Sequence, residues 1–168
     1  YSRLLDGCDD DPVSEFGRRI AAYEVSTILP LGLFIGGAEI ADPEKRAMFD
    51  LLVSYVVRRA ICGLTPKNLN NVFLSVLRGL SRDQPSAAAL SSQLAELKGE
   101  GSRWPRDEEF AMAVKTAEVF PGRLDQPRLR SLLAEIEVGL RASSRIEDTS
   151  WAGLGHLDVD HILPKSWY

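Results

Sequence analysis

The chain has 168 residues, of which 45% are hydrophobic and 26% are charged; this is typical of a globular protein with one or two domains and argues against a disordered chain. Its formal net charge of −4 argues against a stand-alone DNA clamp, because broad phosphate binding usually needs a basic surface. The two cysteines exclude a disulfide scaffold, and no apolar stretch reaches the roughly 18 residues of a membrane-spanning helix.

Helix signals recur along the first 141 residues of the chain. Asp–Pro pairs at 11–12 and 42–43 predict helix starts, because proline fits the first helical turn and the aspartate can accept free backbone amides. Gly63 and Gly99 follow apolar helical patterns and predict helix ends. The expected helices cover residues 11–27, 30–37, 42–63, 65–80, 86–98, 107–119 and 126–141. Six or seven helices joined by short loops predict an all-α bundle.

The apolar residues of these helices predict which faces are buried. The helix over 42–63 carries the widest apolar stripe, so we expect it to be central, with Cys62 as a small core residue. The pair Arg58 and Arg59 near its end is expected on a solvated face. The helix over 107–119 is expected to turn inward Phe110, Val114 and Ala117. The last helix is expected to turn inward Leu129, Leu132, Leu133, Ile136 and Leu140.

The sequence changes character after the last of these helices. Residues 142–156 are rich in serine, glycine and charge, and they predict a linker between a helical domain over 1–141 and a C-terminal segment over 157–168. In that segment apolar and polar residues alternate from Leu157 to Leu163. The alternation predicts a short β-strand that Pro164 ends.

An acidic residue and a histidine stand side by side in this strand. The string from Leu157 to Trp167, LDVDHILPKSW, resembles the first strand of the HNH nuclease motif, which is a ββα-metal fold. It is similar to the C-terminal nuclease domains of GmrSD-type modification-dependent restriction endonucleases. The resemblance implies that Asp160 is a ligand of a divalent metal, magnesium or manganese, and that His161 is the general base. The helical region adds similar elements, which are Arg58, Arg59, Cys62 and Gly63, then Thr65, Asn68 and Leu69, and the string from Trp104 to Phe110.

The chemistry of these two residue types fits phosphodiester hydrolysis. A neutral imidazole has a pKa near working pH and can deprotonate water, and a carboxylate is a hard oxygen ligand for magnesium. Neighbours on a regular strand point to opposite faces, so Asp160 and His161 meet one phosphate only if the strand ends or twists at His161. Pro164 is consistent with such an end.

The resemblance also implies residues and domains outside this chain. An HNH site needs a second strand and a helix with an asparagine or histidine, which we expect beyond Tyr168, so we expect this chain alone to bind no metal and to leave DNA intact. The chain opens on Tyr1 rather than methionine, which suggests a piece of a longer protein. By resemblance, that protein would cut double-stranded, modified phage DNA in the bacterial cytoplasm. It would take an NTP through an upstream domain, have no membrane segment and be a candidate homo-oligomer.

A second interpretation stays open from the sequence. The chain could be a non-catalytic helical module whose acidic surface binds protein partners. The two interpretations differ in the residues expected after Tyr168, because only a nuclease requires an asparagine or histidine on a helix there.

Overall fold

Seven α-helices account for most of the residues that the computed structural model describes, which are residues 4, 11–144 and 159. The helices are α2 (Pro12–Ala21), α3 (Leu29–Gly37), α4 (Asp42–Ile61), α5 (Leu69–Leu80), α6 (Ala87–Glu96), α7 (Asp107–Thr116) and α8 (Gln126–Ser143). Two short turns, η1 (Ser26–Ile28) and η2 (Val119–Arg123), connect neighbouring helices. The described residues contain no β-strand, so the all-α prediction is confirmed for this part of the chain.

The chain divides into two compact units, residues 1–117 and 118–168, and each is described by itself. The first unit holds α2 to α7 with η1, and the second holds η2 and α8. Of the predicted linker and strand, the structure describes only residues 142–144 and Val159. Within the described residues, no helix combines the length and the apolar character needed to cross a membrane.

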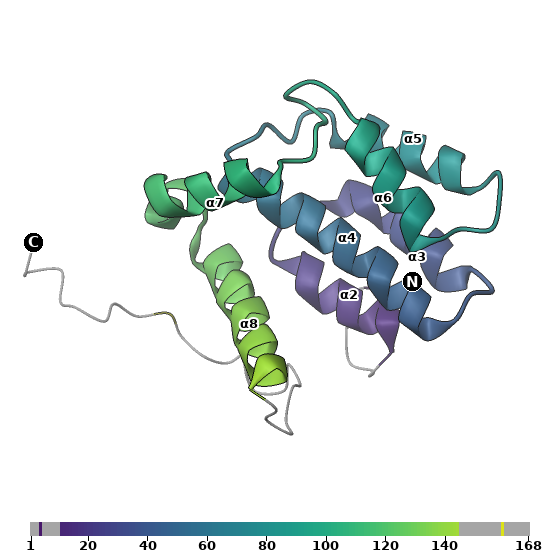
Figure 1. The fold of residues 1–168 in the computed structure, drawn as a ribbon, viewed down its shortest axis with the longest axis horizontal. Coiled ribbons are helices and arrows are strands. Elements are labelled where there is room, and N and C mark those ends of the chain that lie inside the picture. The colour runs from purple at the N-terminus through teal and green to yellow at the C-terminus, as the bar shows by residue number, and fades with distance from the viewer. Residues whose placement is uncertain (1–3, 5–10, 145–158, 160–168) are drawn as a thin grey trace, which may run out of the picture. The chain divides into compact units, whose positions relative to one another are not determined.

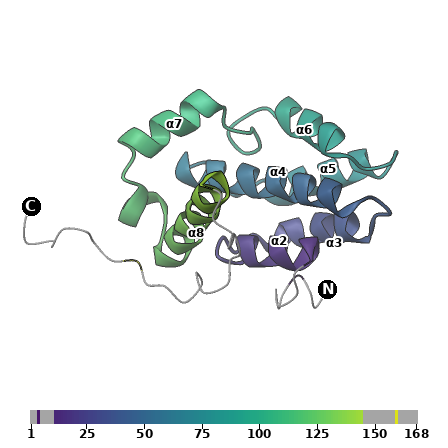
Figure 2. The ribbon, with the colours of Figure 1, turned by 60° about the horizontal axis from the view of Figure 1, so that its bottom comes forward.

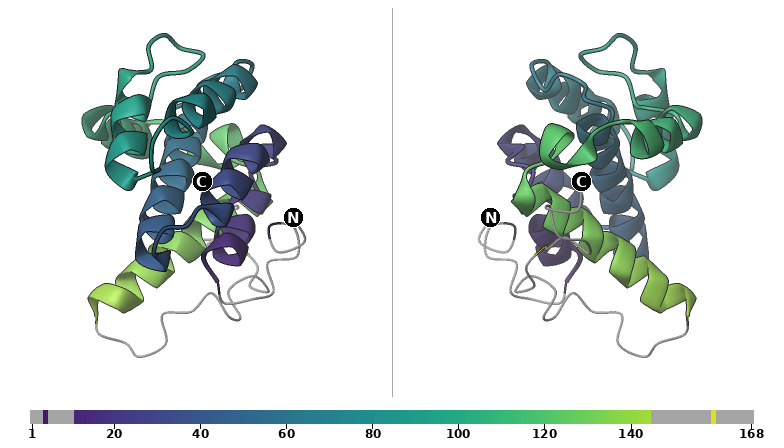
Figure 3. Two further views of the ribbon diagram at one scale, coloured as in Figure 1. Left: turned by 90° about the vertical axis from the view of Figure 1, so that its right-hand side faces the viewer. Right: turned by 90° about the vertical axis from the view of Figure 1, so that its left-hand side faces the viewer.

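α4 is the central helix of the first unit, as its wide apolar stripe predicts. It lies between α2 and α6 and also contacts α3 and α7 (Figure 1). Figures 2 and 3 show the same order from other sides. Side chains on most of its circumference are buried, namely Met48, Phe49, Leu52, Val53, Tyr55, Val56, Val57, Arg59 and Ile61.

Gly63 ends α4, as predicted, through a Schellman cap. Its φ is 67°, in the left-handed region that glycine adopts without steric strain. The amide of Gly63 donates to the Ala60 carbonyl at 3.1 Å, and the amide of Leu64 donates to the Arg59 carbonyl at 2.9 Å. The chain therefore turns back at the end of α4, and Thr65 comes to lie beside the Arg59 side chain.

α2 and α3 approach closely because two glycines of α3 face α2. A Cβ atom at Gly32 would come within 2.8 Å of the Phe16 ring, and one at Gly36 would come within 2.7 Å of Val13. The spacing of four residues places both glycines on one face of the helix. Phe16 in turn stacks on Phe49 of α4, with the ring centroids 4.5 Å apart. The three helices thus share one core.

Two helix boundaries differ from the predictions by four residues or more. α2 ends at Ala21 instead of extending through residue 27, because Glu24 has a φ of 55° that a helix does not accommodate. α5 begins at Leu69 and not at Thr65, whose carbonyl accepts a hydrogen bond from α4.

The predicted inward faces of α7 and α8 are confirmed only in part. Four of the predicted residues are half-buried, namely Phe110, Ala117, Leu129 and Leu132, and the other four are exposed. α7 has no buried side chain, and Val114 is 49% exposed. On α8, Leu133, Ile136 and Leu140 are 44%, 49% and 56% exposed, whereas Ala134 is buried. Apolar residues at helical spacing define a face, but burial of that face also needs an element that packs against it.

Candidate functional site

The residues predicted to carry catalysis, Asp160 and His161, lie outside the described residues. Val159 beside them is described; it is half-buried and has no regular secondary structure. Among the residues that the structure describes, no group of three or more His, Cys, Asp or Glu side chains could hold a metal ion. The nuclease-strand interpretation therefore stays a prediction.

The helical residues that carry the resemblance meet at the carboxyl end of α4. Arg58 and Arg59 project from its last turns, and the loop over 97–106, which joins α6 to α7, lies against both. We name Tyr55, Arg58, Arg59 and Arg103 the arginine cluster. All four belong to the first unit, so their geometry is that of one compact body.

Arg59 is the buried centre of the arginine cluster, with 3% of its surface exposed. Its guanidinium donates to three backbone carbonyls: that of Thr65 at 2.6 Å, that of Arg103 at 2.8 Å and that of Glu100 at 3.2 Å. Burial lowers the pKa of Arg59, because leaving water disfavours its charged form. The expectation of a solvated face is therefore wrong for Arg59, whose side chain follows the apolar stripe of α4 inward.

Tyr55 lies one helical turn before Arg59 and is fully buried. Its hydroxyl donates to the Ser102 carbonyl at 2.6 Å, and the guanidinium carbon of Arg59 lies 5.5 Å from the centroid of its ring. Burial raises the pKa of Tyr55 to about 12, and the nearby charge of Arg59 opposes this only in part. Tyr55 is therefore a neutral hydrogen-bond donor at physiological pH and not a nucleophile.

Arg58 holds the loop where α7 begins. Its guanidinium donates to the Pro105 carbonyl at 3.2 Å and forms an ion pair with Asp107 at 2.5 Å. The same guanidinium lies 5.9 Å from the centroid of the Trp104 ring and 5.1 Å from that of Phe110, within reach of cation–π attraction. These contacts attach the string from Trp104 to Phe110 to the end of α4.

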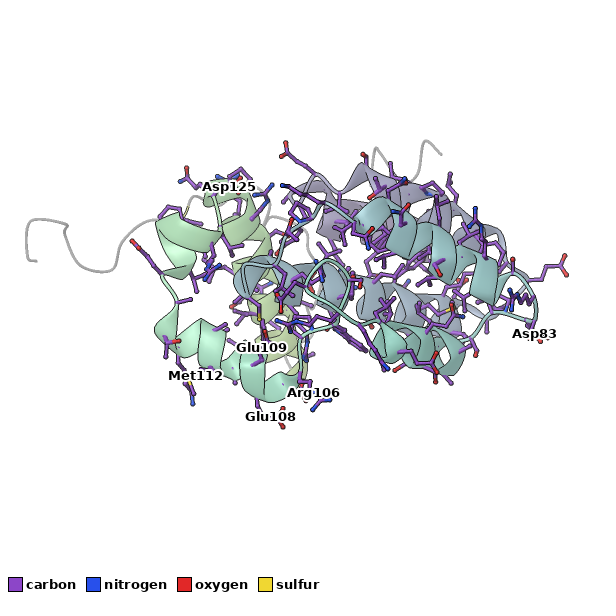
Figure 4. All side chains as sticks on the ribbon, turned by 90° about the horizontal axis from the view of Figure 1, so that it is seen from above. Asp83, Arg106, Glu108, Glu109, Met112 and Asp125 are labelled. Atoms are coloured by element: carbon purple, nitrogen blue, oxygen red, sulfur yellow. The ribbon has the colours of Figure 1, made fainter. Side chains whose placement is uncertain are left out.

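Arg103 closes the arginine cluster from the loop side. Its two terminal nitrogens reach the two carboxylate oxygens of Glu109 at 2.5 and 2.7 Å, and its Nε donates to Glu100 at 3.1 Å. The hydrogen bonds with Glu109 raise the pKa of Arg103, and in turn they lower the pKa of Glu109. Glu108 and Met112, by contrast, lie at the outer edge of α7 (Figure 4).

The arginine cluster positions a loop. Guanidinium donors of all three arginines bond loop carbonyls or carboxylates of the same unit. None of the four side chains is a typical general base, because a guanidinium has no hydrogen-bond acceptor and burial raises the pKa of Tyr55. The geometry provides a fixed connection between the end of α4, the loop over 97–106 and the first turn of α7.

Tyr55, Glu100 and Arg103 belong to this site although the sequence did not single them out. One signal was present: Tyr55 and Arg59 are four residues apart within the apolar stripe of α4, and a charged residue in such a stripe must find buried partners. Nothing in the sequence indicates that these partners are backbone carbonyls, two of which lie more than 40 residues away. Cys62, expected in the core, is half-buried at the C-cap of α4.

Comparison of the chain with models of protein families, with curated proteins and with solved structures finds no match. The resemblance to GmrSD-type endonucleases therefore depends on the residues of this chain that carry it.

Proposed function

We propose that this chain is part of a metal-dependent DNA endonuclease of the HNH type that acts in bacterial restriction of phage DNA. In the full-length protein, Asp160 would be a metal ligand and His161 the general base. The substrate would be double-stranded, modified phage DNA, cut in the cytoplasm. An NTP would bind to a domain outside this chain. The proposal concerns the full-length protein, and we expect the chain alone to be inactive.

The observation that carries the proposal is the string LDVDHILPKSW, with its adjacent acid and histidine and the following proline. The arginine cluster supports it from the helical region. The segments around Arg58, Thr65 and Trp104 resemble the same family one by one, and in the structure they bond to one another. They therefore form a single structural motif. Chance similarity in three unrelated segments is then a weaker explanation of the resemblance.

The donor set of the string fits magnesium. This ion keeps several waters in proteins and takes one or two carboxylates together with substrate phosphate oxygens. Asp160 supplies a carboxylate, and Asp158 lies two residues before it in the alternating pattern. When bound, the ion would neutralise charge on the phosphate and the leaving oxygen. His161 would accept the proton of the attacking water, which a neutral imidazole does best near its own pKa.

The experiment uses the full-length protein with magnesium or manganese, an NTP and modified phage DNA. His161→Ala should lower the cleavage rate by a factor of about 100 or more, since a general base typically contributes that much. Asp160→Ala should also abolish cleavage and weaken metal binding measured by calorimetry. His156→Ala is the matched control, because it removes a histidine from the same segment without touching the acid–histidine pair.

Two results would contradict this proposal. Cleavage that His161→Ala leaves intact would assign the chemistry to other residues. A full-length protein in which no helix with an asparagine or histidine comes after the string, and which leaves every DNA substrate uncut, would favour the non-catalytic interaction module.

A further inference from the structure

α8 carries an apolar stripe whose spacing is that of a coiled-coil seam. Leu129, Leu133, Ile136 and Leu140 succeed one another at intervals of four, three and four residues. This alternation is the a/d pattern of a heptad repeat, which forms a narrow seam suited to one facing helix. Leu133, Ile136 and Leu140 are 44–56% exposed. Three large apolar side chains in a row on one exposed face of a helix mark an interaction surface.

We propose that this stripe pairs with the same stripe of a second copy of the chain, with the two α8 helices antiparallel. In that arrangement Leu129 faces the partner's Leu140, and Leu133 faces the partner's Ile136. Each contact occurs twice around the twofold axis, so the same short stripe is buried on both chains. Antiparallel helices also place each helix amino end beside the other's carboxyl end, which the helix dipoles favour.

The charges beside the stripe favour a second copy of the chain as the partner, and they favour the antiparallel orientation. Arg130 and Glu137 are seven residues apart and so lie on the same flank of the stripe. In an antiparallel pair this flank meets itself, which brings Arg130 beside the partner's Glu137 in two places. A parallel pair would set this flank against the opposite one, where Leu132 and Gly139 stand without charge. Both residues can join such a pair and keep contacts within their own chain. A guanidinium has five N–H donors, and Glu137, which accepts from Arg141 of its own chain at 2.7 Å, has a second carboxylate oxygen.

The opposite flank is shaped for close approach. A Cβ atom added at Gly139 would meet nothing within 4 Å. In the antiparallel pair this flank also meets itself, so the half-buried Leu132 lies against the partner's Gly139. A glycine in the middle of a helix makes the helix less stable than an alanine would. In the dimer, Gly139 would leave room for the partner's leucine, which would account for a glycine at this position.

The pair is expected to be weak, because a single helix of 18 residues offers less than the roughly 1,200 Å² of a standard interface. The test is sedimentation velocity of the 168-residue chain at concentrations from about 1 µM to about 1 mM. We expect a monomer–dimer equilibrium. Leu140→Ser should weaken dimerisation by about tenfold or more. The matched control is Leu74→Ser, which changes a leucine of α5 that is 37% exposed and should leave the equilibrium unchanged.

Charge reversal tests the orientation. These variants are made in an Arg141→Gln chain, because Arg141 forms an ion pair with Glu137 within the chain. Arg130→Glu and Glu137→Arg should each weaken the dimer, and the double variant should restore it because both ion pairs between chains form again with reversed sign. A disulfide cross-link should form between a Leu129→Cys chain and a Leu140→Cys chain, both without the native cysteines, and neither variant should cross-link with itself. Circular dichroism checks that each variant keeps its helix content.

A chain that stays monomeric over the whole range would overturn the proposal, including the case in which the stripe is covered within one chain. A dimer that Leu140→Ser leaves intact would place the contact elsewhere and also overturn it. Failure of the double charge variant to restore the dimer would overturn the antiparallel arrangement. None of these assays uses DNA or metal, so their outcome is independent of the proposed nuclease activity.

Discussion

Replacing Arg59 tests whether the arginine cluster holds the loop over 97–106. Arg59→Met keeps a long apolar stem and removes the guanidinium, so the carbonyls of Thr65, Glu100 and Arg103 lose their donor. A hydrogen bond to a charged group contributes about 1.5–3 kcal/mol, and a buried acceptor left without a partner costs about 1–3 kcal/mol. The sum over three such bonds is an upper limit for the loss in free energy of unfolding, and it exceeds the losses that single substitutions usually cause.

Two effects reduce that limit. The variant no longer buries a charge, and water can reach some of the loop carbonyls once the guanidinium is gone. We therefore expect Arg59→Met to lower the free energy of unfolding by about 3 kcal/mol. Arg59→Lys should lower it by about half as much, because an ammonium can bond some of the carbonyls but lacks the planar fork.

Urea unfolding followed by circular dichroism measures this free energy, and amide hydrogen exchange reports on the loop itself. Exchange should rise over 97–106 in Arg59→Met before it rises in α4. Arg106→Met is the matched control: Arg106 is an exposed arginine of the same loop, and its loss should change stability by less than about 0.5 kcal/mol. A loss below about 1 kcal/mol for Arg59→Met, with unchanged loop exchange, would refute the positioning role.

Two further predictions concern the same region. Gly63→Ala should lower the free energy of unfolding by about 1 kcal/mol or more, because alanine is strained at a φ of 67°. The control is Gly37→Ala within α3, where an added Cβ atom meets nothing within 4 Å and no such loss is expected. Equal losses for the two variants in urea unfolding would contradict the capping role of Gly63. The pKa of Tyr55 is raised to about 12 from 10 in the unfolded chain, so its stabilising contribution is complete below pH 10 and is lost as the pH rises towards 12, by roughly 2–3 kcal/mol. Tyr55→Phe should remove this part of the pH dependence, and a variant that keeps it would contradict the assignment.

The helices were predictable because their signals are local. Prolines in the first turns of α2 and α4 and the glycine after α4 act within a few residues, and each produced the expected start or end. The central place of α4 was predictable from the width of its apolar stripe. The exposure of the apolar stripe of α8 was not predictable. The same pattern of leucines is found on a helix face buried within a chain and on one that packs against another chain.

The candidate site was predictable only in part. Arg58, Arg59 and Trp104 are visible in the sequence as parts of a resemblance, but their role depends on contacts across more than 40 residues. The acceptors of Arg59 are backbone carbonyls, which every residue has, so no side-chain pattern could identify them. Asp160 and His161 belong to residues whose structure is not described, and their role stays a prediction.

The attachment of α7 is uneven along its length. Its first turn is held by Arg58 and Arg103, through the carboxylates of Asp107 and Glu109, whereas its later residues, 111–116, are mostly exposed. Local opening of a helix costs least where few side chains are buried, so α7 should fray from its carboxyl end while its first turn stays attached to α4. That end lies next to the second unit, which begins at Glu118.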